Sequence, residues 1–272
     1  MKNLNSFNYK WPILLLVLAF SGCKINNKST NNQQFIVKVM SYNIHHGNPP
    51  GYENKIDLKA IVETIKNADA DIVALQEVDV NTKRSGNINE AEILAKELGM
   101  FLFFSKAIDF DGGDYGLAII SKYPLTETHF EKLSLAADAK AEPRILQMVT
   151  VNIPNQKPFV FANTHLDVLN TGNRPLQAKQ IVAIANKHKL PFIIAGDWNA
   201  TLNSTTLSIM DEAFTRTCSN CPVTCIEEGE NGAIDFIAYT KSAPFKTKNY
   251  SVFSDNYASD HFPILAEIII TK

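Results

Sequence analysis

The chain has 272 residues, 45% of them hydrophobic and 20% charged, which is enough to build one globular domain with a sizeable core. Its 26 basic and 28 acidic residues give a formal charge of −2. Proteins that hold nucleic acid through its phosphates usually carry an overall basic excess, which this composition does not offer, although a local basic patch is compatible with it.

The first 22 residues are expected to be an export signal. Lys2 and Lys10 precede an apolar run from Trp11 to Phe20, and Ser21-Gly22-Cys23 closes it. At about ten residues, the run is well short of the roughly 20 that a membrane-spanning helix needs. Its end resembles a bacterial lipobox, with Phe20 where leucine is usual. We therefore expect lipidation of Cys23 and a lipoprotein anchored at the periplasmic or outer cell surface; ordinary secretion with a free Cys23 is the alternative.

Residues 23–34 are polar and too poor in apolar groups to pack, which predicts a tether between the anchor and a domain over residues 35–272. Cleavage of the signal would remove Lys2 and Lys10 from the 26 basic residues, leaving 24 against 28 acidic ones and a formal charge of −4.

Short β-rich runs alternate with helical patterns from Phe35 onward. The helices are expected after an Asp57 cap, from Glu90 to Leu98 with Gly99 as its stop, and after Pro175. Strands are predicted over residues 35–42, 72–75, 117–120, 145–151, 159–162, 192–195, 233–239 and 264–270. Because strands outnumber helices about two to one and many connections look like hairpins, we expect an α/β sandwich with mixed sheets.

Three cysteines crowd into one segment, at Cys218, Cys221 and Cys225. Export favours a disulfide between two of them, in a stapled surface loop, and the spacing leaves the pair open. A metal cluster with three thiolates is the alternative, but the export signal and the lack of a fourth ligand disfavour it.

Polar clusters follow Met40, Leu75, Ala162 and Ala195, each at the end of an apolar run, so their side chains can converge on one crevice. Glu77 offers a carboxylate of the kind that Mg²⁺ prefers. Taken alone, it is more commonly a solvated acid at a strand end.

The remaining clusters offer acid–base groups. Asp197 can accept a proton from water, and Asn199 can contact a phosphate or leaving oxygen, although such residues often only form turns. His165 and His261 titrate near neutral pH. Asp235 is a charge inside an apolar run and must be paired if buried, which orienting His261 would achieve.

Taken in order, these motifs are far more specific than any one of them. They are Asn43 after a strand, Gln76-Glu77, Asn163-Thr164-His165, Gly196-Asp197-Trp198-Asn199, Ile234-Asp235-Phe236-Ile237 and Ser259-Asp260-His261. Together they resemble the endonuclease/exonuclease/phosphatase superfamily, which includes DNase I, apurinic endonucleases, inositol polyphosphate 5-phosphatases and neutral sphingomyelinases. The resemblance covers Phe35 to Thr271.

The resemblance implies a DNase I-like fold, a four-layer sandwich of two packed mixed sheets flanked by helices, with the site at one end. It also implies that Glu77 binds Mg²⁺ or Mn²⁺, with Asn43 and Asp260 near the metal or the phosphate. Asp197 would position and deprotonate the attacking water. Asn199, His165 and His261 would stabilise the pentacovalent phosphorus, and Asp235 would pair with His261.

Two departures from the family pattern affect this assignment. His45 stands where apurinic endonucleases carry an acidic residue, which predicts a lighter metal shell. Tyr115 lies one position away from their substrate-contacting tyrosine and is its nearest counterpart. Three arginines between the motifs, Arg84, Arg144 and Arg174, are candidate phosphate contacts because guanidinium groups suit phosphate, although surface arginines are commoner than ligands. His46 is expected to be a loop residue.

The sequence therefore predicts an exported, monomeric, Mg²⁺-dependent phosphoesterase. Acidity and anchoring favour a small phosphorylated molecule or a phospholipid head group, as either a phosphodiester or a phosphomonoester. A secreted DNA or RNA nuclease is the alternative. A binding lipoprotein that has lost catalysis is disfavoured because Glu77, Asp197, Asp260 and both histidines are present.

Overall fold

The structure is a computed structural model that describes residues 34–226, 232–254 and 257–271. The predicted signal over residues 1–22, Cys23 and nearly all of the predicted tether lie outside these ranges. No helix within them is long and apolar enough to cross a membrane.

The first sheet is mixed and has six strands. Its one parallel pair is β1 with β2, and all its other neighbours are antiparallel. In spatial order its strands are β11 (Phe245–Val252), β12 (Ile264–Ile270), β1 (Phe35–Asn43), β2 (Ile72–Val80), β4 (Gly113–Ser121) and β3 (Phe101–Phe110).

The second sheet repeats this arrangement, with a single parallel pair, β7 and β8, near its centre. In spatial order its strands are β5 (Leu125–Lys132), β6 (Ile145–Val151), β7 (Phe159–His165), β8 (Phe192–Asp197), β10 (Asp235–Thr240) and β9 (Phe214–Arg216).

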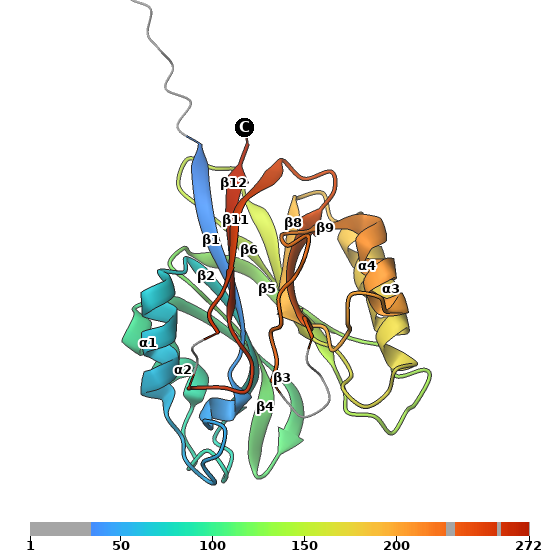
Figure 1. Ribbon diagram of the computed structural model, residues 1–272. Helices are drawn as coiled ribbons and strands as arrows, with labels where there is room; N and C mark the ends of the chain where they lie inside the picture. The colour runs from blue at the N-terminus through green and yellow to red at the C-terminus, as the bar shows by residue number, and fades with distance from the viewer. Residues whose placement is uncertain (1–33, 227–231, 255–256, 272) are drawn as a thin grey trace, which may run out of the picture. The chain divides into compact units, whose positions relative to one another are not determined.

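Helices cover the outer face of each sheet, as Figure 1 shows. The first pair, α1 and α2, packs on the first sheet, and the second pair, α3 and α4, packs on the second. Their bounds are α1 (Leu58–Ala68), α2 (Glu90–Leu98), α3 (Asn173–Lys187) and α4 (Thr205–Ala213). The expected sandwich of two mixed sheets between helical layers is confirmed.

Alternate residues of the central strands enter different cores. On β2, Ile72 and Ala74 pack between the two sheets, whereas Val73 and Leu75 face α1 and α2. Because side chains alternate across a strand, a strand buried on both faces needs a continuous apolar run. This explains why these strands are predictable from the sequence.

The helix boundaries agree with the sequence signals. The carboxylate of Asp57 accepts a hydrogen bond from the backbone N–H of Ala60, which caps α1. Gly99 ends α2 in the left-handed conformation. In α3, Pro175 is the third residue, and Ile181 and Ala185 are buried.

Several elements were not predicted: β3, β5, β9, β11 and α4. β5 is almost entirely exposed along the edge of its sheet, and β3 also lies at an edge. An edge strand is held by the hydrogen bonds of a single neighbour, so its sequence need not carry the apolar pattern of a buried strand. Some of the predicted strands are also longer than expected: β2 continues five residues past Leu75, to Val80.

Candidate active site

The ends of the central strands bring the predicted polar residues together. Asn43, His165 and Asp197 are the last residues of β1, β7 and β8, and Glu77 lies within β2. They therefore lie inside the extended strands and not in turns after them. Cross-strand register places Asp197 opposite both His165 and Asp235.

Gly196 is required for this register. A Cβ atom at this position would lie 2.0 Å from the carbonyl oxygen of Thr164, a separation that no packed structure tolerates. Only glycine allows β7 and β8 to approach so closely just before His165 and Asp197.

The side-chain amide of Asn43 joins two carboxylates from different sheets. Its Nδ2 donates to Glu77 Oε1 at 3.0 Å and to Asp197 Oδ2 at 3.1 Å, and its Oδ1 accepts from the backbone N–H of His45 at 3.1 Å. Both carboxylates therefore converge on one amide group. Like charges held this close are stabilised by a cation.

Four non-glycine residues at or beside the site have left-handed backbone conformations. Glu77 adopts φ 58° at the β-bulge between Leu75 and Val78, and Asn199 adopts φ 46°. His45 and His46 have φ 45° and 41°. Such conformations cost about 1–3 kcal/mol each in non-glycine residues and cluster at functional sites.

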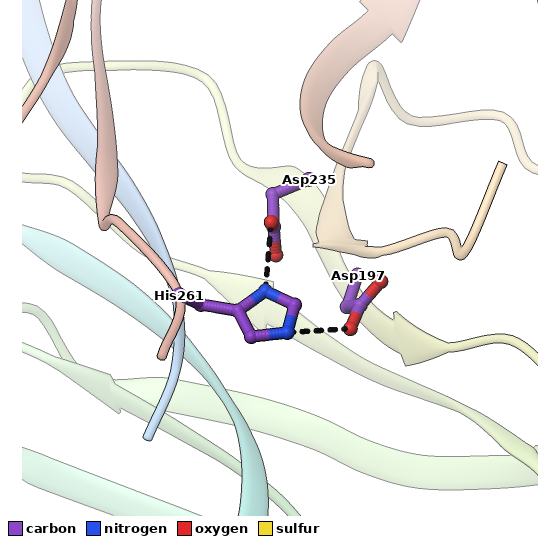
Figure 2. Close-up of side chains that lie close together, drawn as sticks. All are labelled: Asp197, Asp235 and His261. Carbon is purple, nitrogen blue, oxygen red and sulfur yellow. Dashed lines mark hydrogen bonds and ion pairs between the residues drawn. The ribbon is translucent and has the colours of Figure 1, made fainter. Parts of the chain in front are cut away.

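His261 lies between two buried carboxylates, as Figure 2 shows. Its Nδ1 is 2.9 Å from Asp235 Oδ2, and its Nε2 is 3.7 Å from Asp197 Oδ2. Burial alone would lower the pKa of His261, but the charges of Asp235 and then Asp197 raise it well above its ordinary value. The imidazole is therefore a protonated, oriented donor at neutral pH.

The expected pairing of Asp235 with His261 is thus present in the structure. Asp235 is itself oriented by Thr224, whose hydroxyl oxygen accepts hydrogen bonds from the backbone N–H groups of Ile234 and Asp235, both at 3.1 Å.

His165 approaches the same oxygen of Asp197 from β7, with its Nε2 at 3.5 Å. Burial, followed by the positive charge of Arg144, lowers the pKa of His165 well below its ordinary value. One neutral and one protonated imidazole therefore face one carboxylate. Both distances exceed those of ordinary N–H···O hydrogen bonds, so the histidines surround Asp197 without closing on it.

Asp197 is the centre of the cluster. Its Oδ1 accepts the backbone N–H of Asn199 at 2.9 Å, while its Oδ2 faces Asn43 and both histidines. Burial, and next the charge of Asp235, raise the pKa of Asp197 above its ordinary value. A carboxylate with a raised pKa is a stronger base, as activation of water requires.

Asn199 lies beside Asp197, but one of its amide hydrogens is already used. Its Nδ2 donates to the carbonyl oxygen of Leu166 at 3.0 Å, which fixes the side chain between two loops. The side-chain oxygen and the second amide hydrogen of Asn199 are therefore the groups that can make its expected contact with the substrate.

Two sets of residues could hold a metal ion, and the first consists of the predicted ligands Glu77, Asn43 and Asp260. Glu77 and Asn43 contact each other directly, whereas Asp260 is linked to Asn43 through the Ser259 hydroxyl, 2.7 Å from the Asn43 carbonyl oxygen and 3.2 Å from Asp260 Oδ1. A second set is Asp197, Asp235 and His261, whose ligand atoms lie within 4.8 Å of one another.

The carboxylate groups of Glu77 and Asp197 fit a hard divalent cation. Carboxylate oxygens from Glu77 and Asp197 converge from opposite sheets, and such oxygens are what Mg²⁺ and Mn²⁺ take from proteins. Burial alone would raise the pKa of Glu77, but the adjacent His46 imidazole, then His165 and the hydrogen bond from Asn43, hold it well below its usual range. Glu77 is therefore ionised and able to ligate a cation at neutral pH.

The three arginines have different environments. Arg84 forms a two-point ion pair with the buried Asp79, at 2.6 and 2.9 Å, and its guanidinium lies 4.3 Å from the ring centre of Phe110 and 5.5 Å from that of Tyr115. Arg174 donates to the carbonyl oxygens of Asp167 and Val168.

Arg144 lies beside His165. It is buried and lines a small cavity together with Tyr115 and His165.

His46 and Gln147 support the site, although the sequence pattern assigned neither of them a role in it. His46, expected to be a loop residue, has its Nδ1 4.0 Å from Glu77 Oε2. A chain of buried amides also supports the site and runs through Gln147, Asn163 and Gln76. Gln76 Nε2 donates to Asn163 Oδ1 at 2.8 Å across the two sheets. A glutamine inside an otherwise apolar strand is the signal that would have found Gln147.

The structure assigns the cysteines, which the spacing left open. Cys218 and Cys221 form a disulfide with a Cα–Cα distance of 5.1 Å. Cys225 is a buried free thiol, and its backbone bridges to that of His261.

Comparison with known proteins agrees with this architecture. Among solved structures, an endonuclease/exonuclease/phosphatase family protein from Bacteroides thetaiotaomicron superposes with a TM-score of 0.73 at 19% identity, over 88% of this chain and 100% of that one. A mannosyl-6-phosphatase from the same organism gives a TM-score of 0.69 at 19% identity, over 85% and 99% of the two chains.

A third similar structure is ANGEL2, a 2′,3′-cyclic phosphatase, with a TM-score of 0.67 at 17% identity over 87% of this chain and 96% of that one. At these identities the likeness concerns the fold. No curated protein sequence matches the chain.

The sequence itself carries the family assignment. The profile of the endonuclease/exonuclease/phosphatase family matches residues 40–261, which is most of the chain and includes every polar cluster described above. With its motifs placed at the ends of two packed mixed sheets, this chain belongs to the endonuclease/exonuclease/phosphatase family.

Proposed function

We propose that this protein is an exported hydrolase that uses a divalent cation to cleave the P–O bond of a phosphorylated small molecule or a phospholipid head group. The observation that carries the proposal is the environment of Asp197 Oδ2, which Asn43, His165 and His261 approach from three strands or loops. Members of this family are phosphoric ester hydrolases.

Each residue has a role that follows from its environment. Asp197, with its raised pKa, accepts a proton from the attacking water. His261, protonated and oriented by Asp235, donates to a phosphate oxygen as negative charge develops there. His165 offers a neutral N–H from β7. Water adds to phosphorus as Asp197 takes its proton, the P–O bond to the alcohol breaks, and the leaving oxygen takes up a proton from the solvent.

Glu77 and Asn43 would hold the cation, with Asp260 beside them. When bound, a divalent cation would polarise the phosphate and offset the surplus of carboxylate charge. In its absence, Asn43 keeps Glu77 and Asp197 in place through its amide hydrogens.

Composition favours a small substrate over a polynucleotide. The expected mature charge of −4 would repel nucleic acid unless a local basic surface compensates. Two structurally similar proteins are phosphatases by name, one of them bound to adenosine-2′,3′-vanadate. A secreted nuclease remains the second candidate because the family includes endonucleases and exonucleases.

A substrate panel tests the proposal. The purified protein is assayed with Mg²⁺, Mn²⁺ or a chelator on chromogenic phosphomonoesters and phosphodiesters, sugar and inositol phosphates, sphingomyelin and plasmid DNA. We expect metal-dependent turnover of a small ester, strongly reduced in Asp197→Asn. Activity that survives chelation, or persists in Glu77→Ala and His261→Ala, would overturn the mechanism. Preferential cleavage of DNA, with a steep loss at high salt, would identify the nuclease.

Export and anchoring are tested separately. The basis is the N-terminal sequence, in which an apolar run ends at Ser21-Gly22-Cys23. We expect incorporation of labelled fatty acid and recovery in the membrane fraction, both lost in Cys23→Ser. Recovery of the unaltered protein as a soluble, unlabelled product would contradict the lipid anchor.

A further inference from the structure

A small cavity adjoins the catalytic centre and has no role in the chemistry described so far. Tyr115, Arg144 and His165 line it together with the apolar side chains of Leu117 and Ile145. Its volume is about 10 Å³. A cavity of that size admits about one water-sized group, such as a single oxygen atom.

Arg144 is an unusual lining residue because its charge is buried with little compensation. Its relative exposure is 5%, and the ion pair that it forms within the described ranges joins Nη1 to Glu142 Oε1 at 3.1 Å. The Glu142 side chain is 39% exposed, so solvent weakens this pair. Arg144 Nε is buried and has no hydrogen-bond partner within the described ranges of the chain.

His165 shows the same feature. Its Nδ1 is buried and lacks a hydrogen-bond partner among the residues that the structure describes. Leaving a buried polar atom unpaired costs about 1–3 kcal/mol, so two such atoms on residues that line one cavity require an explanation. A ligand oxygen that enters the cavity during the reaction provides one.

The cavity is connected to the reaction centre through His165. The other nitrogen of this ring, Nε2, lies 3.5 Å from Asp197 Oδ2. A phosphate attacked by water beside Asp197 would therefore lie next to His165, which also lines the cavity with Arg144 and Tyr115. One of its oxygens could reach the cavity.

Charge and size together select among phosphate esters. A phosphomonoester carries three non-bridging oxygens and close to two negative charges at neutral pH, whereas a diester carries two such oxygens and one charge. The buried guanidinium complements the additional charge. The cavity admits an oxygen atom but not the carbon substituent of a second ester bond.

From this arrangement we infer that the protein is selective for phosphomonoesters, and that Arg144 confers the selectivity by binding the third non-bridging oxygen in the cavity. The inference rests on the proposed function, since it assumes that phosphate esters are hydrolysed at Asp197. It assigns to Arg144 a direct contact with the substrate, with Tyr115 forming the opposite wall.

Two substrates with one leaving group test the inference. These are p-nitrophenyl phosphate, a monoester, and methyl p-nitrophenyl phosphate, in which a methoxy group replaces one charged oxygen. We expect wild type to prefer the monoester. We expect Arg144→Gln to lower kcat/KM for the monoester by about 10²–10³-fold, as loss of a transition-state donor does, and to change the value for the diester little. Arg144→Lys, which keeps the charge but not the planar donor group, should lie between.

Arg216→Gln is the matched control, because Arg216 is ion-paired with Asp211 through 2.8 and 3.1 Å contacts away from the cavity and should behave as wild type on both substrates. Calorimetric binding of inorganic phosphate to the Mg²⁺-loaded protein gives a readout independent of turnover. We expect Arg144→Gln to weaken it by about 10–100-fold, the usual range for a lost hydrogen bond to a charged group. Arg144→Lys serves the same purpose if Arg144→Gln does not fold.

The outcomes separate the inference from the proposed function. Equal losses on both substrates, or unchanged phosphate binding in a folded Arg144 variant, would overturn the inference, as would a wild-type protein that cleaves only diesters. If wild type hydrolyses no phosphate ester with either metal, the proposed function itself fails.

Discussion

Glu90 gives the fold a dependence on pH that a single substitution can isolate. It is the first residue of α2 and is fully buried, with Oε2 accepting the backbone N–H of Asp79 at 2.8 Å. Burial raises the pKa of Glu90 to about 8; the hydrogen bond from Asp79 opposes this rise, and the charge of Asp79 adds to it. The carboxyl group is therefore largely protonated in the folded protein at neutral pH.

The magnitude follows from linkage. The pKa of Glu90 is 4.5 as its reference value and about 8 in the folded protein, so the folded state retains this proton between those limits while the unfolded state loses it. Stability from this group is fully present below pH 4.5 and falls as the pH rises towards 8. At about 1.4 kcal/mol for each pH unit, the total loss is up to about 5 kcal/mol.

Glu90→Gln should remove this loss because the amide cannot ionise and still offers an oxygen to the Asp79 N–H. Urea unfolding of wild type and variant at about pH 5 and about pH 8.5 measures the effect. We expect the free energy of unfolding of Glu90→Gln relative to wild type to increase by several kcal/mol from the lower to the higher pH. Any fixed cost of the new amide hydrogens cancels in this comparison.

Glu92→Gln, at an exposed position of the same helical turn, is the matched control and should follow wild type at both pH values. If the difference between Glu90→Gln and wild type does not change with pH, or changes with the opposite sign, the Glu90 carboxyl group is not held protonated by the fold, and the argument is refuted.

Three further predictions concern the active site and the disulfide. Asp197→Asn should lower kcat by about 10²–10⁴-fold, the usual contribution of a general base. The same variant should unfold at a higher temperature in chelator at pH 8, because it removes a buried charge whose pKa is raised. A lower unfolding temperature would contradict this. Asp235→Asn should shift the NMR titration of the His261 imidazole to lower pH, because Asp235 is the charge that raises its pKa most; an unchanged titration would show that the pair is not coupled. Cys218→Ser should lower the free energy of unfolding by about 2 kcal/mol, the chain-entropy value for so short a loop, and should retain activity. Urea unfolding under non-reducing conditions measures the change. Equal stability would show that the disulfide constrains the unfolded chain little.

Much of the fold was predictable because burial leaves a periodic record in the sequence. The strand Ile145–Val151 was predicted with its observed bounds, since every residue in it is buried. The exposed strand β5 was missed because its conformation is fixed by hydrogen bonds to β6 and not by an apolar pattern. Local signals also located helix ends, as Asp57 and Gly99 show.

The family of this chain and the side chains available for chemistry can be recognised from the sequence, because the motifs occur in order along it, at Asn43, Glu77, His165, Asp197 and His261. How these side chains are used depends on the folded structure. It joined Asn43 to Asp197, 154 positions away, paired Arg84 with Asp79, and buried Arg144 beside His165. Residues far apart in the chain come into contact only when the two sheets pack against each other. Local sequence patterns encode the apolar faces of these sheets, but not the polar contacts that form at the ends of the strands.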